Sequence, residues 1–131
     1  CLTSLSEFLY MIVAAKEKWG KESINFTLNI LRFPSFQSPL VLPDEIRNKY
    51  KDELQDFYNT VQHNPVMHQF ELNHVLRLID YLDIVKTPHS DAFNMPELHN
   101  DFKHFYQQYD SRRGKDFQTT FPELASWYNT L

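Results

Sequence analysis

The stretch INFTLNILRF, residues 24–33, determines how the rest of the chain is interpreted. Its apolar residues recur at every second position, and this is the one clear period-two run in the sequence: Ile24, Phe26, Leu28 and Ile30. Such a period is typical of a β-strand, whose successive side chains point to opposite faces. A buried strand needs partners for its backbone N–H and C=O groups. Residues 40–42 could pair weakly with it, but we expect its main partners in an N-terminal part that precedes this sequence.

The segment before the predicted strand indicates an amphipathic helix over residues 4–19. Its apolar residues recur at spacings of three and four: Leu5, Phe8, Leu9, Ile12 and Val13. Ser4 could cap this helix with Glu7 in a capping box, and Gly20 suits its C-terminal end. Lys16 would then lie near the negative pole of the helix dipole. A helix followed by a strand is half of a repeating β/α unit.

Four further helices are predicted after the strand. Three prolines within residues 34–43 exclude a continuous helix there. Apolar stripes and capping residues then predict helices over residues 43–61, over residues 67–86, from Asn94 onward, and from a Thr120–Glu123 capping box to Trp127.

The predicted fold class is therefore mainly α. It consists of one β/α unit from the end of a partial (β/α) barrel, followed by about four helices. Residues 1–42 would be the last helix, strand and loop of the barrel, and residues 43–131 would form a helical C-terminal region.

Composition limits the classes of protein that fit. The chain has 131 residues, a net charge of −4 and a single cysteine, Cys1. One cysteine forms neither an internal disulfide nor a cluster motif, and we expect a reducing, cytoplasmic location. No signal peptide or apolar run of the ~18 residues needed to span a bilayer is visible, so no membrane partner is expected. The modest acidic charge argues against nucleic acid as a partner. Because the first residue is not methionine, we expect a processed or truncated chain.

Arg32, at the end of the predicted strand, is the main candidate for substrate binding. In α/β folds the C-terminal ends of strands face the ligand. A guanidinium there could hold a carboxylate or phosphate, and nearby polar side chains could add hydrogen bonds: Asn29, Ser35, Gln37 and Ser38. Arg32 could equally meet solvent or a helix acid. No nucleophile motif or phosphate-binding loop is visible, so we predict no catalytic residue in this chain.

Among the six histidines, one has a spacing that is used for metals. Glu71 and His74 form a Glu-x-x-His pair, as in di-iron helical bundles. Those sites need a second such pair and two more glutamates, which the sequence lacks. We therefore predict no metal site, with the histidines on a surface or interface.

A short basic cluster follows the fourth predicted helix. Arg112, Arg113 and Lys115 could contact phosphate. A solvated turn, or pairing with Asp110 and Asp116, is the interpretation that the sequence favours.

The order of these segments resembles a known family. Residues 5–54, LSEFLYMIVAAKEKWGKESINFTLNILRFPSFQSPLVLPDEIRNKYKDEL, resemble the late barrel region of radical S-adenosylmethionine (SAM) enzymes. Residues 71–82, ELNHVLRLIDYL, and residues 109–128, YDSRRGKDFQTTFPELASWY, resemble the tail of members with a reduced, twitch-like C-terminal region. The most specific part is the Asp-x-Arg-Arg-Gly and Phe-Pro-Glu-Leu ending.

The resemblance implies a chemistry that this chain cannot supply by itself. In the intact protein a [4Fe–4S] cluster, held by a Cys-x3-Cys-x2-Cys motif, would cleave SAM to a 5′-deoxyadenosyl radical that abstracts hydrogen from a substrate. That motif is absent here. The partner would be the missing N-terminal barrel of the same polypeptide, and Asn29, Arg32, Ser35 and Gln37 would contact an unknown substrate. The alternative is a small all-helical protein-interaction module without catalysis.

Overall fold

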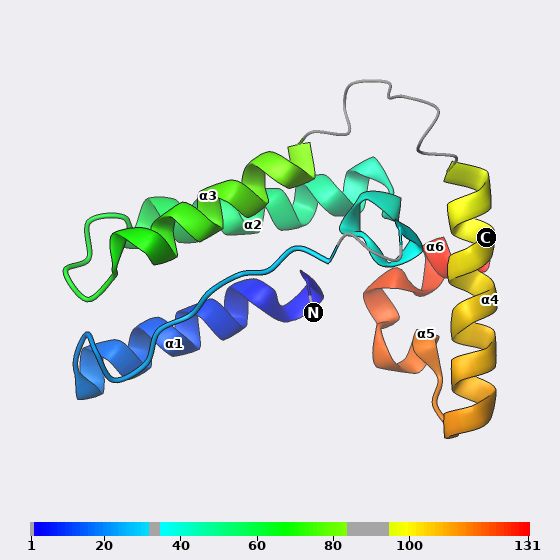
Figure 1. Ribbon diagram of the computed structural model, residues 1–131, viewed down its shortest axis with the longest axis horizontal. Coiled ribbons are helices and arrows are strands. Elements are labelled where there is room, and N and C mark those ends of the chain that lie inside the picture. Colours follow the sequence, from blue (N-terminus) through cyan, green and yellow to red (C-terminus); the bar gives the residue numbers. More distant parts are fainter. Residues whose placement is uncertain (1, 32–34, 84–94) are drawn as a thin grey trace. The chain divides into compact units, whose positions relative to one another are not determined.

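The computed structural model describes residues 2–31, 35–83 and 95–131, and it confirms that the chain is mainly helical (Figure 1). The chain forms two compact units, each built from two stretches of sequence. The first unit comprises residues 1–30 and 44–87, and the second comprises residues 31–43 and 88–131.

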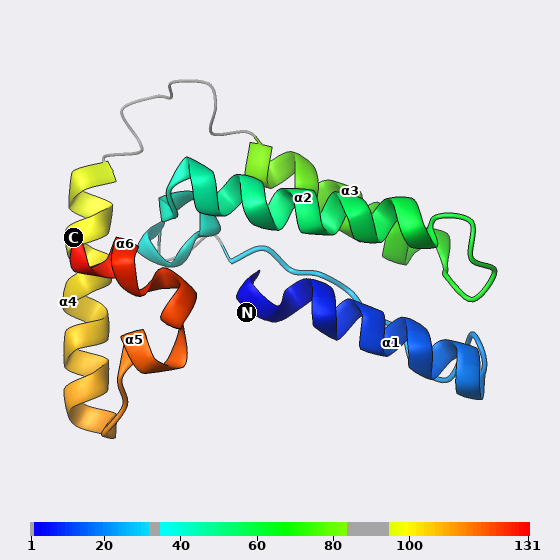
Figure 2. The ribbon, with the colours of Figure 1, turned by 180° about the vertical axis from the view of Figure 1, so that it is seen from behind.

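Three long helices build the first unit: α1 (Leu5–Trp19), α2 (Asp44–Val61) and α3 (Gln69–Asp83). A short 3-10 turn, η1 (Leu2–Ser4), precedes α1. α2 and α3 lie side by side in both views and form a helical hairpin (Figures 1 and 2). Their apolar faces share one core with α1 that includes Leu9, Ile12, Val13, Leu54, Phe57, Val75 and Leu82.

The ends of these helices follow from local chemistry. α1 ends at Gly20, which has a φ of 107°. This conformation is unfavourable for residues that carry a Cβ atom. α2 begins directly after Pro43, with Asp44 and Glu45 at the positive pole of its dipole. The predicted capping box at the start of α1 does not form, because the Ser4 side chain makes no capping hydrogen bond.

Arg47 joins α2 to the end of α3 inside the first unit. Its buried guanidinium donates a hydrogen bond to the Leu82 carbonyl oxygen at 3.3 Å and forms an ion pair with Asp44. Burial lowers the pKa of Arg47 from its ordinary value, and the negative charge of Asp83 partly opposes that change. The Arg47 cation on α2 therefore binds the C-terminal, carbonyl end of α3.

Residues 24–31, the described part of the predicted strand, are extended but form no sheet (Figure 1). The predicted alternation is present, because Phe26 is buried and Leu28 and Ile30 pack on the core, while Thr27 and Asn29 are exposed. No strand occurs in the described ranges, so the β/α unit is not shown. Residues 40–42 are not a pairing strand either, since Leu40 and Val41 belong to a 3-10 turn of the second unit.

The second unit contains α4 (Met95–Arg113) and several short elements. These are the 3-10 turns η2 (Ser35–Gln37), η3 (Pro39–Val41) and η5 (Pro122–Leu124), and the helices α5 (Phe117–Thr120) and α6 (Ala125–Asn129). Aromatic rings form the core of this unit. Phe102 lies 5.1 Å from Trp127 and 5.4 Å from Phe117, and Phe117 stacks on Tyr128 at 4.7 Å between ring centroids.

The capping box predicted in this unit is wrong. Thr120 does not open a helix with Glu123 but ends α5, where its hydroxyl donates a hydrogen bond to the Asp116 carbonyl oxygen. The helix predicted from Asn94 onward is present as α4, with Phe102 buried and Phe105 and Tyr109 exposed. Asn94, the predicted cap of α4, lies outside the described residues.

Within the described ranges, no helix combines the length and the apolar character that a bilayer crossing requires.

Candidate functional site at the extended segment

The Lys16 side chain is completely buried on α1 and fully hydrogen-bonded. Its Nζ lies 2.9 Å from Glu71 Oε1, 2.8 Å from Asn25 Oδ1 and 3.2 Å from the Lys21 carbonyl oxygen. A lysine ammonium has three N–H donors, so each donor has its own acceptor. Lys16 thereby joins α1, the turn that follows it and α3 at a single point.

Glu71 is the acceptor at the centre of this arrangement, and it too has no exposed surface. Besides Lys16, its carboxylate accepts hydrogen bonds from the backbone N–H groups of His68, at 3.0 Å, and Phe26, at 3.2 Å. Glu71 is the third residue of α3 and His68 directly precedes the helix, which is the geometry of a capping-box glutamate. A buried charge with this many charge-assisted bonds is well compensated.

Two more α3 side chains bind the extended segment at Leu28, two residues after Phe26. The Leu28 N–H donates a hydrogen bond to His74 Nδ1 at 2.9 Å, and Arg77 donates one to the Leu28 carbonyl oxygen at 2.5 Å. His74 Nδ1 also lies 3.2 Å from the Leu28 carbonyl oxygen. We call Glu71, His74 and Arg77, which follow one another at three-residue spacing, the α3 clamp.

The other edge of the extended segment has no such partners among the residues that the structure describes. In extended backbone the N–H and C=O groups of successive residues point to opposite sides. The α3 clamp binds Phe26 and Leu28, so the groups of Thr27 and Asn29 point the other way. Across the described ranges, the backbone groups of Thr27 and Asn29 have no hydrogen-bond partner. We call these groups the open edge; they are arranged as in an edge strand that lacks its neighbour.

The four predicted substrate-binding residues do not all fall in one unit. Asn29 is exposed on the open edge of the first unit. Gln37 belongs to the second unit, where its Oε1 accepts a hydrogen bond from the Tyr106 hydroxyl at 3.2 Å. Ser35 begins η2, and Arg32 lies outside the described residues. Gln37 therefore has a role inside its own unit, and Asn29 is exposed.

The predicted Glu-x-x-His pair is occupied by protein groups. Glu71 and His74 Nδ1 both bind the backbone of residues 26–28. The described residues contain no group of three histidine, cysteine or acidic side chains arranged to hold a metal ion. An iron–sulfur cluster needs three or four thiolates. This chain has one cysteine, so its residues do not fit the cluster that the family resemblance implies.

The buried pair of Lys16 and Glu71 was missed at the level of sequence, where Lys16 was assigned to the helix dipole. A signal was present. Lys16 continues the spacing of Leu9, Ile12 and Val13, so it had to lie on the buried face of α1. A charge at such a position predicts a buried partner of opposite charge.

No protein-family model, no curated protein and no solved structure matches this chain.

Proposed function

We propose that this chain is the C-terminal part of a radical SAM enzyme of the cytoplasm, where it covers a partial barrel and contacts the substrate. The observation that carries the proposal is the open edge of residues 24–31. One side of this segment is fixed by the α3 clamp, and the other side offers backbone groups of Thr27 and Asn29 that have no hydrogen-bond partner within the described ranges. A strand from the missing barrel would satisfy those groups by pairing with them.

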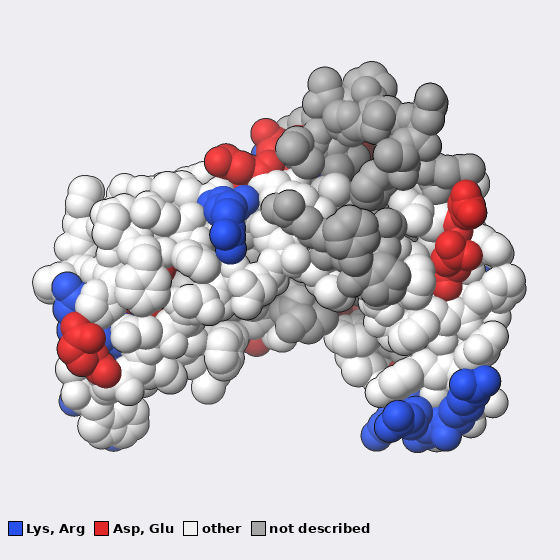
Figure 3. All heavy atoms as spheres, viewed as in Figure 1, with Lys and Arg blue, Asp and Glu red and all other residues white. Residues whose placement is uncertain are grey.

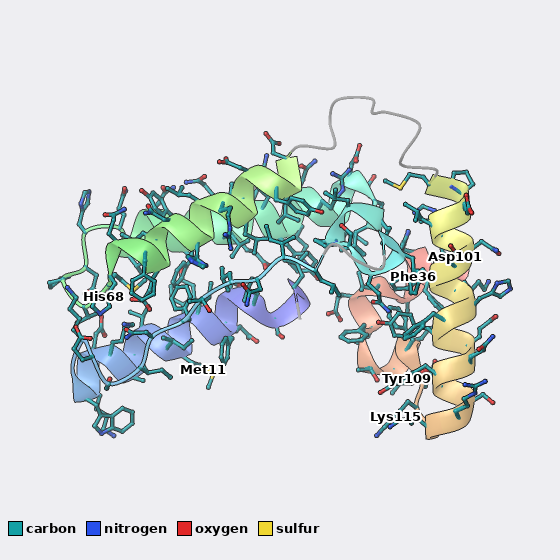
Figure 4. All side chains as sticks on the ribbon, in the orientation of Figure 1. Met11, Phe36, His68, Asp101, Tyr109 and Lys115 are labelled. Carbon is teal, nitrogen blue, oxygen red and sulfur yellow. The ribbon has the colours of Figure 1, made fainter. Side chains whose placement is uncertain are left out.

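The outer face of α1 supports the same proposal. Phe8, Met11 and Trp19 are exposed by 55, 69 and 67 %. Figure 4 shows the labelled Met11 pointing away from the extended segment and α3. Large apolar side chains gathered on one helix are typical of a surface that another part of a protein covers. The alternative, a self-contained helical interaction module, expects such side chains to be buried within the chain.

In this proposal the chain is not active by itself. The missing part would hold the [4Fe–4S] cluster and SAM, and the cluster, when bound, would supply the radical chemistry. This chain would contribute the strand that closes one side of the barrel. Asn29, Arg32, Ser35 and Gln37 remain the proposed substrate contacts, and Asn29 is the one whose exposure on the open edge supports that role.

The reading frame upstream of Cys1 provides the first test. We expect it to encode a Cys-x3-Cys-x2-Cys motif. The longer polypeptide, purified without oxygen and supplied with iron and sulfide, should bind a cluster and release 5′-deoxyadenosine from SAM on reduction. Variants with those cysteines changed to alanine are the matched control and should do neither.

A reading frame without the three-cysteine motif would contradict the proposal. So would a longer polypeptide that contains the motif but cleaves SAM equally well with residues 24–131 deleted, because the chain described here would then have no part in the barrel.

A further inference from the structure

We propose that the end of α4 in the second unit binds single-stranded nucleic acid. The surface consists of two exposed rings, Phe105 and Tyr109, and three basic side chains, Arg112, Arg113 and Lys115. We call it the α4 patch. The proposal is independent of the proposed enzymatic function, because it uses only residues of the second unit.

The two rings form an exposed stack. Phe105 and Tyr109 are one helical turn apart on α4 and lie nearly parallel, with an interplanar angle of 20° and 6.1 Å between their centroids. Their side chains are 41 and 42 % exposed. Phe36 from η2 supports Phe105 at 5.4 Å. Exposed, supported aromatic faces are the stacking platforms on which proteins bind unpaired bases.

The basic side chains extend this stack. The Arg113 guanidinium lies 5.8 Å from the centre of the Tyr109 ring, so Phe105, Tyr109 and Arg113 follow one another at four-residue spacing on one face of α4. Figure 3 shows basic side chains gathered at the end of α4 that leads into α5, and Figure 4 places the labelled Tyr109 and Lys115 at that end.

The two acids that the sequence suggests as partners of these basic side chains, Asp110 and Asp116, accept hydrogen bonds from other groups. Asp110 Oδ2 accepts a hydrogen bond from the Phe117 N–H at 2.9 Å, and Asp116 Oδ2 accepts one from the Thr119 hydroxyl at 2.5 Å. No ion pair joins Arg112, Arg113 or Lys115 to an acid in the part of the chain that the structure describes.

The helix dipole favours cations in the last turn of α4, but Lys115 lies beyond that turn. Three cations without an acidic partner among the described residues, beside stacked rings, therefore fit the phosphates and bases of a nucleic acid strand better than a bare helix end. The net charge of −4 argued against nucleic acid as a partner. It is a sum over the whole chain, however, and does not reflect the local concentration of positive charge in the α4 patch.

The test measures binding of a fluorescent oligouridylate of about 12 nucleotides to the 131-residue chain by anisotropy, across a range of salt concentrations. Because three basic side chains contribute about −0.7 each, log affinity should fall with log salt with a slope of about −2. Replacing Arg112, Arg113 and Lys115 by Gln should weaken binding at least about tenfold and flatten that slope.

Two further variants separate the patch from general charge. Replacing Lys18, Lys21 and Lys49 by Gln removes the same number of charges from exposed positions in the first unit, and it should change affinity by less than about twofold. The double variant Phe105→Ala/Tyr109→Ala should weaken binding about tenfold while leaving the salt slope unchanged. Circular dichroism of every variant should show the wild-type helix content.

Several results would overturn the proposal. These are no measurable binding at about 50 mM salt, equal losses in the two triple variants, or no effect of removing the two rings. Equally tight binding of polyglutamate would show instead a surface for acidic protein segments.

Discussion

At the scale of single residues, the Lys16–Glu71 ion pair is the costliest interaction to disrupt. Both side chains are inaccessible to solvent, so each charge depends on the other and on the backbone groups around it. Lys16→Met would leave the Glu71 carboxylate buried without its cation, and we expect a loss of about 3–5 kcal/mol in the stability of the first unit. Urea unfolding followed by far-UV circular dichroism measures this.

The double variant Lys16→Met/Glu71→Gln is the matched control, since it removes both charges and keeps an acceptor at position 71. It should recover at least about half of the loss, because the uncompensated charge is gone. A loss below about 1 kcal/mol in the single variant would mean that the pair behaves as an exposed one.

The Lys16–Glu71 pair illustrates which parts of the structure could be predicted from the sequence. The helical period of α1 predicted its boundaries and its buried face, because amphipathic spacing is a local property. It could not identify which acid meets Lys16, since Glu71 is distant in the chain and only folding brings the two together. The predicted capping boxes failed for a related reason: Thr120 binds backward to Asp116, and that local choice depends on where α4 ends.

At the scale of elements, the extended segment should show alternating protection from hydrogen exchange. The amide protons of Phe26 and Leu28 are bonded to Glu71 and His74, whereas those of Thr27 and Asn29 have no acceptor among the described residues. We expect the first pair to exchange at least about tenfold more slowly than the second, as measured by NMR.

The longer polypeptide of the proposed enzyme gives a direct comparison. Pairing with a barrel strand would slow exchange at Thr27 and Asn29 as well, and the alternation would disappear there. Slow exchange of all four protons in the isolated 131-residue chain would contradict the open edge, and fast exchange of all four would contradict the α3 clamp.

The period-two run therefore predicted the right exposure pattern for residues 24–31 but not their hydrogen bonding. Alternation reports which side chains are buried, and an extended segment lying against helices alternates just as a strand does. Two of the α3 side chains that bind it, Glu71 and His74, were considered at the level of sequence as a candidate metal pair. The exposure of Asn29 could thus be predicted from the sequence, whereas the clamp that holds the segment could not.

At the scale of the whole molecule, the stability of the second unit should depend on alkaline pH. In the second unit, burial raises the pKa of Tyr106 and of Tyr128 above the ordinary value of 10.0, with nearby Asp110 adding to the effect in both. The unfolded chain then loses these protons first. Stability from the two tyrosines is fully present below pH about 10 and falls as pH rises through the higher folded values.

Tryptophan fluorescence can follow the second unit alone. Trp127 is buried there, and the exposed Trp19 of the first unit can be replaced in a Trp19→Phe background. The free energy of unfolding that Trp127 reports should decrease as pH rises above about 10, by up to about 1 kcal/mol per pH unit, and the urea midpoint should decrease with it. Tyr106→Phe removes one of the two ionisable groups and should make this dependence shallower. A midpoint independent of pH would contradict the inferred burial of the two hydroxyls.

The division of the sequence between the units has an evolutionary consequence. The polypeptide passes from one unit to the other three times, after residues 30, 43 and 87. A recombination event that transferred residues 88–131 alone would leave behind η2 and η3, and with them Gln37 and the Val41 carbonyl oxygen that bind Tyr106 and His99. Because each unit is built from two separate stretches of sequence, no single uninterrupted segment encodes either unit without including part of the other.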